Sequence, residues 1–270
     1  MKASERLAAM TAEDLRGYLA FVLDLYDRFG KEGRRIREPL VKRQKKPMRS
    51  ILRASAAQAG PGLIAEFGVH KGHSIRLLAE IFPERTIHGF DSFEGFPDDG
   101  RGDWRQDFSL PELPEVPANV RLHQGYFGDT LAPFVQDLEA EETAALLHID
   151  CDIYSSAAEV FDSLGRTIRP GTVLLFDELV NYDEFLSNEM LALFEWCQGS
   201  GLEVRWAAAK GRLRPLPDFR TGVEGGFAGY RQQGFYQNAG LIVVTDENAP
   251  ARRERFLDEA ATVAEILGLA

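Results

Sequence analysis

Residues 63–74, with the sequence LIAEFGVHKGHS, decide how this chain folds. The mainly apolar run Leu63–Phe67 is followed by Gly68 and Gly72, and a helical pattern begins at Ser74. This is the order of a buried β-strand, a tight turn and a helix, and glycine in such a turn lets a ligand approach the backbone closely. The stretch therefore predicts the first unit of an α/β sheet, with a binding loop where its strand ends.

The same rhythm of short apolar runs and helical stretches continues to about residue 180. The predicted strands are Leu63–Phe67, Thr86–Asp91, Val120–Gln124, Ala145–Asp150 and Thr172–Asp177. The predicted helices between them are Ser74–Ile81, Leu131–Leu138 and Ser155–Thr167. Alternating strands and helices are typical of a parallel sheet built from βαβ units. We therefore predict an α/β fold with a Rossmann-like, doubly wound, mostly parallel sheet.

Further elements are expected on both sides of this region. Two N-terminal helices, at residues 12–29 and 48–59, make residues 1–59 an expected helical extension that acts as a lid or an oligomer contact. Residues 60–270 form the expected core. Its later elements are a helix at 186–199, strands at 202–207 and 239–244, and a helix at 254–269.

Composition and charge exclude several classes of function. The chain has 270 residues and a formal net charge of -11, which argues against nucleic acid as a partner. A basic run at residues 34–49 is the local exception, read either as a solvated segment or as a surface for an acidic partner. No apolar run approaches the roughly 20 residues of a membrane span, and the N-terminus lacks a signal-peptide pattern. We expect no membrane contact, a cytoplasmic location and two reduced core thiols, Cys151 and Cys197.

Three strand ends suggest a nucleoside-containing cofactor. The loop after the first strand reads E-x-G-x-x-x-G, which differs from the G-x-G-x-x-G of dinucleotide sites and is weak evidence alone. Asp91 ends the second strand where a ribose would lie, and it could accept both ribose hydroxyls or cap the following segment. Gly125, Tyr126 and Phe127 follow the third strand and suit an adenine ring.

Residues 147–156, LHIDCDIYSS, and residues 171–178, GTVLLFDE, carry a family resemblance. With the loop above, they make the chain resemble class I methyltransferases that use S-adenosylmethionine. Within that class it is similar to the macrocin O-methyltransferase family of natural-product sugar methylases, over about residues 60 to 245. The residues then expected to bind S-adenosylmethionine are Glu66, Gly68, Gly72, Ser74, Asp91, Ser92, Gly125, Tyr126, Phe127 and Asp150.

The resemblance also implies a magnesium site beside the methyl donor. Asp150 ends the fourth strand, and Asp177 and Glu178 end the fifth, so the three carboxylates are expected to converge at one edge of the sheet. Oxygen ligands suit Mg²⁺ or another hard divalent cation, although a single strand-end acid could instead cap a helix. Many relatives carry Asp-Asp where this chain has Asp177-Glu178, which puts the choice of metal in doubt.

Asp152 is the candidate general base, with orientation of a ligand or helix capping as the alternative. The 206–236 insertion holds cations and aromatic rings over Lys210–Tyr236, suited to an anionic small molecule or to a dimer contact. Trp104, in the Pro97–Pro117 loop, is a candidate for a lid over the site. The combined prediction is an O-methyltransferase, assisted by magnesium and acting on a hydroxyl of a small molecule, in a homo-oligomer. The alternatives are a metal-independent N-methyltransferase, a nicotinamide-binding oxidoreductase and a non-catalytic member.

Overall fold

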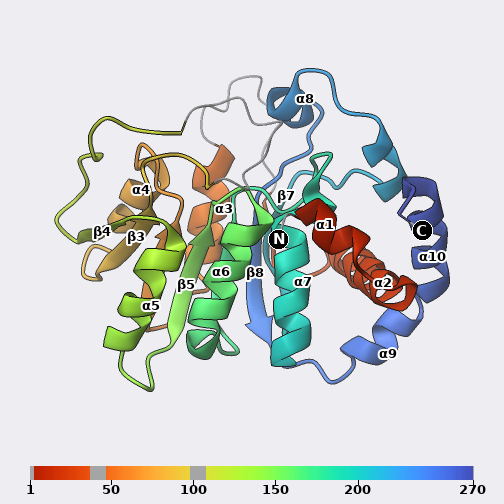
Figure 1. Cartoon of the computed structure of the whole chain (residues 1–270), viewed down its shortest axis with the longest axis horizontal. Coiled ribbons are helices and arrows are strands. Elements are labelled where there is room, and N and C mark those ends of the chain that lie inside the picture. Colours follow the sequence, from red (N-terminus) through yellow and green to blue (C-terminus); the bar gives the residue numbers. More distant parts are fainter. Residues whose placement is uncertain (1–2, 37–46, 98–107, 270) are drawn as a thin grey trace.

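The computed structural model describes residues 3–36, 47–97 and 108–269, and these residues form one eight-stranded sheet with helices on both faces (Figure 1). The strand order is β1-β7-β8-β6-β5-β2-β3-β4. The strands are β1 (Arg34–Ile36), β2 (Leu63–Phe67), β3 (Ile87–Asp91), β4 (Val120–Gln124), β5 (Ala144–Ile149), β6 (Val173–Phe176), β7 (Glu203–Lys210) and β8 (Ala239–Val244). Strand β8 runs antiparallel to its neighbours β6 and β7, and the other pairs are parallel. The predicted α/β, mostly parallel sheet is confirmed.

The order of strands β2 to β6 identifies where a ligand binds. From β4 the sheet passes back through β3 to β2, and then forward through β5 to β6. In doubly wound sheets the ligand lies beyond the carboxyl ends of the strands, at the point where the order reverses. Here that point lies between β2 and β5, so these two strands position the site.

The central strands form because their residues are buried on both faces. All residues of β2 and β5 are buried, as expected for strands covered by helices on both sides. Ile64 and Leu146 point into a cluster with α3 and α4, whereas Phe67 and Leu147 point into the larger cluster on the opposite face. Glu66 and His148 are the charged or titratable residues of these two strands, and both belong to the site described below.

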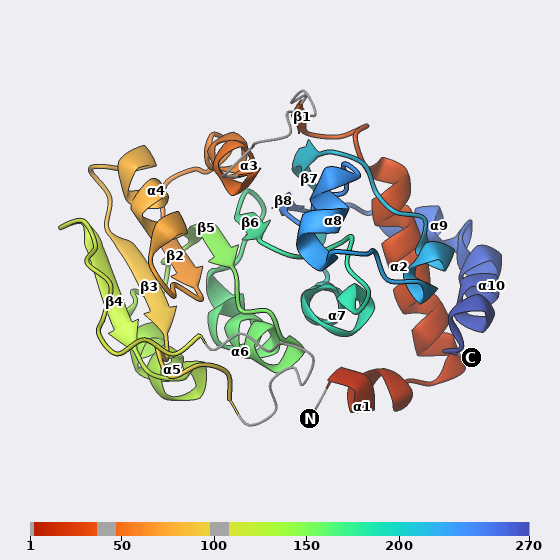
Figure 2. The same ribbon diagram turned by 90° about the horizontal axis from the view of Figure 1, so that it is seen from above.

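Helices cover the two faces of the sheet unequally (Figure 2). On one face lie α3 (Pro47–Ala56) and α4 (His73–Ile81). On the other lie α5 (Phe127–Asp137), α6 (Tyr154–Leu164) and α7 (Glu189–Ser200). None of the helices in the described ranges has the length and apolar composition needed to cross a bilayer.

Residues before the central sheet contribute to the same core. Helix α1 (Ala3–Ala8) is followed by α2 (Ala12–Arg28), which packs against α9 (Ala249–Glu254) and α10 (Leu257–Leu267). Strand β1 pairs with β7 at the far edge of the sheet. Part of the predicted N-terminal extension therefore completes the sheet and core, while its role as a lid or oligomer contact stays a prediction.

Several element boundaries differ from the prediction for physical reasons. Helix α5 begins at Phe127 rather than Leu131, because Gly128 and Asp129 interrupt the apolar pattern but Asp129 is favourable in a first helical turn. The helix predicted at 254–269 corresponds to α10, and α9, which precedes it, was not predicted. The 206–236 insertion contains a 3-10 helix at Leu216–Arg220 and α8 (Gly226–Gln232), neither of which was predicted.

Two sequence features lie wholly or partly outside the described residues. Trp104 is one of them. The basic run at 34–49 falls mostly on residues 37–46, and of its described members Arg49 lies 3.6 Å from the carboxylate of Glu80.

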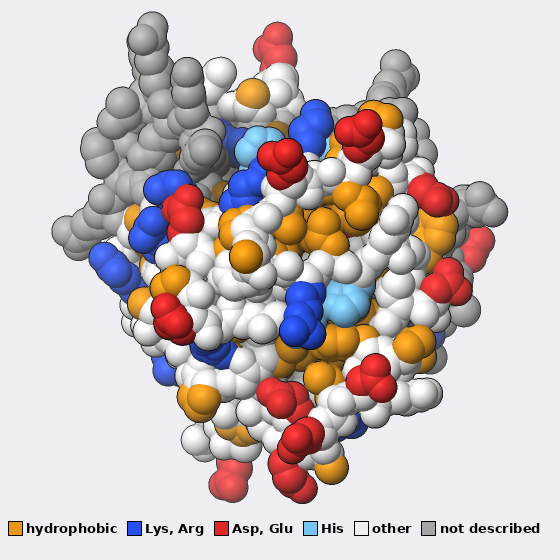
Figure 3. Space-filling view, turned by 90° about the vertical axis from the view of Figure 1, so that its left-hand side faces the viewer, with side chains coloured by type: hydrophobic (Ala, Val, Ile, Leu, Met, Phe, Trp, Pro, Cys, Tyr) orange, Lys and Arg blue, Asp and Glu red, His pale blue; other side chains and the backbone are white. Residues whose placement is uncertain are grey.

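At the edge of the sheet opposite β1, Figure 3 shows hydrophobic side chains gathered between charged ones on the side of the molecule formed by β3, β4 and their helices.

Candidate active site

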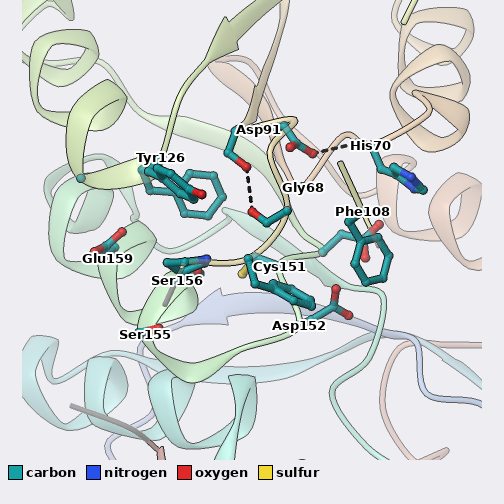
Figure 4. A pocket seen from close by; sticks show the side chains of 17 residues that line it. Gly68, His70, Asp91, Phe108, Tyr126, Cys151, Asp152, Ser155, Ser156 and Glu159 are labelled. Carbon is teal, nitrogen blue, oxygen red and sulfur yellow. Dashed lines mark hydrogen bonds between the residues drawn. The ribbon is translucent and has the colours of Figure 1, made fainter. Parts of the chain in front are cut away.

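A cavity of about 290 Å³ lies at the carboxyl ends of β2, β3 and β5. In Figure 4, Tyr126 and His70 stand on opposite sides of it, Asp91 lies above, and Cys151 and Asp152 lie below. Its wall is formed by Gly68, His70, Asp91, Ser92, Gly95, Phe96, Pro97, Phe108, Tyr126, Phe127, Gly128, Asp150, Cys151, Asp152, Ser155, Ser156 and Glu159. The cavity therefore lies at the reversal point that the topology indicates.

The glycine loop lets strands β2 and β5 approach each other closely. Gly68 has φ +91°, and a Cβ atom there would lie 1.8 Å from the carbonyl oxygen of Asp150. Its backbone N–H donates to the carbonyl of Phe90 over 2.9 Å, which anchors the loop to β3. Only glycine fits this position, because any side chain would collide with the backbone of β5.

Asp91 organises the loop through three backbone N–H groups. Its Oδ2 accepts from the N–H of Val69 and of His70, each over 2.7 Å. Its Oδ1 accepts from the N–H of Phe93 over 2.7 Å. Two carboxylate oxygens offer about four lone-pair positions, so one position remains for a ligand hydroxyl. The expected ribose contact with both hydroxyls stays a prediction, and holding the loop is a function that sequence reasoning did not assign.

Six of the ten residues expected to bind the cofactor line this cavity. They are Gly68, Asp91, Ser92, Tyr126, Phe127 and Asp150. The other four, Glu66, Gly72, Ser74 and Gly125, are not part of its wall. The cavity also includes residues that were not expected to bind the cofactor, among them Ser155 and Ser156, which end the quoted LHIDCDIYSS segment and lie in the first turn of α6.

Glu66 is instead the centre of a buried polar network behind the loop. Its Oε2 lies 2.8 Å from Nδ1 of His148, and its Oε1 accepts from the Ser74 hydroxyl over 3.0 Å. Glu66 and His148 are both completely buried. Buried polar networks of this kind hold strands and helices in register. Glu66 and Ser74 are therefore placed to support the cofactor loop from behind.

A second cavity of about 180 Å³ adjoins the first. The two cavities share Phe108, Asp150 and Asp152. The remaining wall of the second consists of Asp177, Glu178, Phe227, Arg231 and Gln237. The structure therefore brings Asp150, Asp152, Asp177 and Glu178 to one cavity, as the sequence predicted for the ends of β5 and β6.

Burial and mutual repulsion raise the pKa values of these acids. The pKa of Asp150 is well above its usual range because the group is buried and Asp177 and Asp152 lie nearby. The pKa of Glu178 is raised by burial and by its hydrogen bond with Asp152. For Asp177 burial also raises the pKa, although His148, Arg231 and the Asn238 amide oppose it. Such clustered acids are stabilised by positive charge.

The donor set fits a hard divalent cation in its chemistry. The three expected ligands supply only carboxylate oxygens, and Oε2 of Glu178 is buried with no hydrogen-bond partner among the described residues. Within the part of the chain that the structure describes, however, no three His, Cys, Asp or Glu side chains are already gathered around one point. The side chains of Asp150, Asp177 and Glu178 would have to rotate to bind an ion together.

Asp152, the candidate base, lies on a constrained turn between the cavities. Its φ of +64° is left-handed, a conformation that is uncommon for residues other than glycine and often occurs at functional sites. The N–H of Ile153 donates to the carbonyl of Cys151 over 2.7 Å, closing the turn around Asp152. Glu189, which sequence reasoning missed, accepts from the N–H of Cys151 over 3.3 Å. The turn is therefore held on both sides.

The 206–236 insertion contributes fewer site residues than its composition suggested. Phe227 and Arg231, both on α8, line the second cavity. Arg214 is buried instead, with its guanidinium donating to Asp183 over 3.1 Å and to the hydroxyl of Tyr230 over 2.9 Å. The rest of the insertion therefore holds α8 in place.

Comparisons with known proteins agree with this geometry. Residues 65–179 match the family model described as a methyltransferase domain. No curated protein matches the sequence significantly. The crystal structure of CalS11, a calicheamicin methyltransferase, matches with a TM-score of 0.51 and 20% identity, over 73% of this chain and 89% of that chain. The O-methyltransferase NovP matches with a TM-score of 0.44 and 19% identity, over 73% of this chain and 91% of that chain.

The matched family segment contains the features that build the site. It runs from β2 to the end of β6, so it includes the glycine loop, Asp91 and the acids at 150, 152, 177 and 178. The likeness to CalS11 shows the same fold over most of both chains. The chain therefore carries a methyltransferase domain over residues 65–179 and shares the fold of CalS11.

Proposed function

We propose that this chain is an S-adenosylmethionine-dependent methyltransferase of class I. It acts on a hydroxyl oxygen of a small molecule, such as a sugar or another secondary metabolite, with help from Mg²⁺ or a similar cation. The observation that carries the proposal is the pair of adjoining cavities, which share Asp150 and Asp152. A donor in the first cavity and an acceptor in the second would meet at this shared wall.

The residues of the first cavity would bind and orient the methyl donor. Gly68 allows close approach to the backbone, Asp91 offers one remaining lone-pair position, and Tyr126 offers an aromatic face for a nucleobase. Holding the donor sulfonium in line with the acceptor oxygen supplies a large part of the rate enhancement. A methyltransferase therefore needs few groups that act directly on the reacting atoms.

Asp152 would take the proton from the acceptor hydroxyl, because it lines both cavities. As the O–H bond loses its proton to the carboxylate, the oxygen lone pair forms the new C–O bond. The bond between methyl carbon and sulfur breaks, and its electron pair stays on sulfur. Asp150, Asp177 and Glu178 would hold the cation, whose positive charge makes a nearby hydroxyl more acidic.

A metal-independent N-methyltransferase is the second candidate. It is favoured by the observation that the described residues hold no ready-made group of three metal-ligating side chains. In this case the acids of the second cavity would bind an amine. The two candidates differ in their response to chelation.

Isothermal titration with S-adenosylmethionine tests the proposal. The titration is run in Mg²⁺ and again in excess chelator, and NAD serves as the control ligand. We expect S-adenosylmethionine to bind in both conditions and NAD not to bind. Transfer of labelled methyl groups to hydroxylated acceptors is then expected in Mg²⁺ and not in chelator. Equal transfer in chelator, or transfer only to amines, contradicts the metal-assisted proposal. A homo-oligomer and a cytoplasmic location stay predictions.

A further inference from the structure

Gln237 is a buried amide whose hydrogen-bonding groups are unused. It is separated from β8 by Asn238, its exposed fraction is 1%, and it lines the second cavity. Neither Nε2 nor Oε1 has a hydrogen-bond partner among the described residues. Buried side-chain amides are almost always hydrogen-bonded in folded proteins, so this one requires a partner that comes from elsewhere.

The backbone around Gln237 is fixed by its neighbours. Its carbonyl oxygen accepts from the N–H of Leu179 over 2.9 Å and of Val180 over 3.3 Å. The next residue, Asn238, donates from Nδ2 to the backbone oxygen and to Oδ1 of Asp177, each over 2.7 Å. Asn238 therefore holds an expected metal ligand, whereas the amide of Gln237 stays available at the cavity wall.

Arg231 supplies a positive charge to the same cavity. Among the described residues that line the two cavities, it is the one lysine or arginine. Its side chain is exposed at the surface, and its positive charge favours the ionised form of Asp177 at the same wall. An exposed guanidinium beside a cavity is suited to a carboxylate or phosphate of a ligand. The rings of Phe108 and Phe227 add apolar walls between these polar groups.

We propose that Gln237 and Arg231 recognise the acceptor, and that the acceptor is a polyhydroxylated small molecule with a negatively charged substituent. The Gln237 amide binds a hydroxyl that is not methylated, because an amide offers the donor and the acceptor that a hydroxyl needs. Arg231 binds the anionic substituent at the outer side of the cavity. This inference rests on the proposed function, in which the second cavity holds the acceptor.

The test uses four probes of one ring size and protein saturated with S-adenosylhomocysteine in Mg²⁺. The probes are 3,4-dihydroxybenzoate, 3-hydroxybenzoate, uncharged catechol and the phosphonate analogue of the first. Isothermal titration is expected to show that removing one hydroxyl or the charge weakens binding by about tenfold, as for a lost hydrogen bond to a buried group. Comparison of the carboxylate and the phosphonate distinguishes the two kinds of anion.

Two variants assign these preferences to residues. Gln237→Leu is expected to bind 3,4-dihydroxybenzoate and 3-hydroxybenzoate equally, with unchanged binding of S-adenosylhomocysteine. Its melting temperature should not fall, because an apolar side chain replaces an unsatisfied buried amide. Arg231→Gln is expected to lose the preference for charged probes. Gln232→Leu, at an exposed position of the same helix, is the matched control.

Three results overturn the inference. The first is a Gln237→Leu variant that keeps the hydroxyl preference, which leaves internal water as the partner of the amide. The second is a variant that weakens Mg²⁺ binding without acceptor, which makes Gln237 a metal ligand. The third is wild-type protein that binds S-adenosylhomocysteine but none of the probes. Absence of S-adenosylhomocysteine binding would instead contradict the proposed function itself.

Discussion

The two halves of the site are built on different physical principles. In the first cavity and its glycine loop, here called the cofactor half, backbone groups and one carboxylate satisfy each other. Asp91 there accepts hydrogen bonds from three backbone N–H groups. In the second cavity, here called the acid half, Glu178 and Gln237 keep buried polar atoms without partners among the described residues. Satisfied groups define one rigid arrangement, whereas unsatisfied ones are completed by whatever binds. The first half is therefore preformed, and the second depends on its ligands.

The two halves meet where Gly68 contacts the backbone of Asp150. A substitution that alters the properties of one half alone supports the distinction between the halves. A change that affects both halves equally would show that they act as one unit.

The largest expected effect is in the acid half. Asp150→Asn should reduce turnover on the order of 10³-fold, because metal assistance contributes several kcal/mol to the barrier. Donor binding should fall far less than turnover, because the other five expected donor-binding residues of the first cavity are unchanged. Methyl transfer and isothermal titration measure the two quantities separately. Asp137→Asn, at an exposed position of α5, is the control. Full activity of Asp150→Asn in chelator would remove the metal from the scheme.

Gly68→Ala should destabilise the protein by about 3 kcal/mol or more, because the new methyl group collides with the Asp150 carbonyl and φ is positive. Urea unfolding measures this loss. Gly171→Ala is a matched control, since φ there is +103° but nothing lies within 4 Å of the added Cβ. Gly171→Ala should lower the free energy of unfolding by about 1 kcal/mol, from backbone strain alone. Equal losses in both variants would show that the contact between the halves is unimportant.

Asp91→Ala should weaken the binding of S-adenosylmethionine by about 100-fold, because three loop N–H groups lose their acceptor. Asp91→Asn keeps one acceptor oxygen and should lose less affinity. Isothermal titration compares the two variants, with Mg²⁺ affinity as the control for the acid half. If both variants bind the donor as tightly as wild type, the loop is held by other contacts.

The smallest expected effect is on the pH dependence of stability, and it comes from His88 in β3, the strand that ends at Asp91 in the cofactor half. Burial, and then His123, lowers the pKa of His88 to about 4, whereas an unfolded histidine titrates near 6.5. Between these values the unfolded state binds more protons, so this contribution to stability is present above about pH 6.5 and is lost as pH falls toward 4. His88→Gln should show a weaker fall of melting temperature across that interval. An unchanged pH profile would assign the fall to other groups.

Much of the fold could be predicted because it depends on local patterns. Strands β2, β4 and β8 have the predicted bounds. Strands β2 and β8 are short, mainly apolar runs, and β4 begins with alternating apolar and polar residues. Asp91 and Asp150 were recognisable because they stand where such runs end. Glu66 belonged to the same motif, yet its side chain reaches His148, which lies 82 positions along the chain. The motif identified Glu66 as a site residue, but no pattern in the sequence indicated that its side chain contacts His148.

The sequence by itself determined the class of fold and the acids at the strand ends, because hydrophobic periodicity and strand termini are properties of consecutive residues. Only the tertiary structure decided that Gln237, from the loop before β8, and Arg231, from α8, complete the wall beside Asp177. Only it revealed which buried polar atoms remain without partners. Burial and hydrogen bonding are set by packing between distant segments, and this packing is not encoded in any one stretch of the chain.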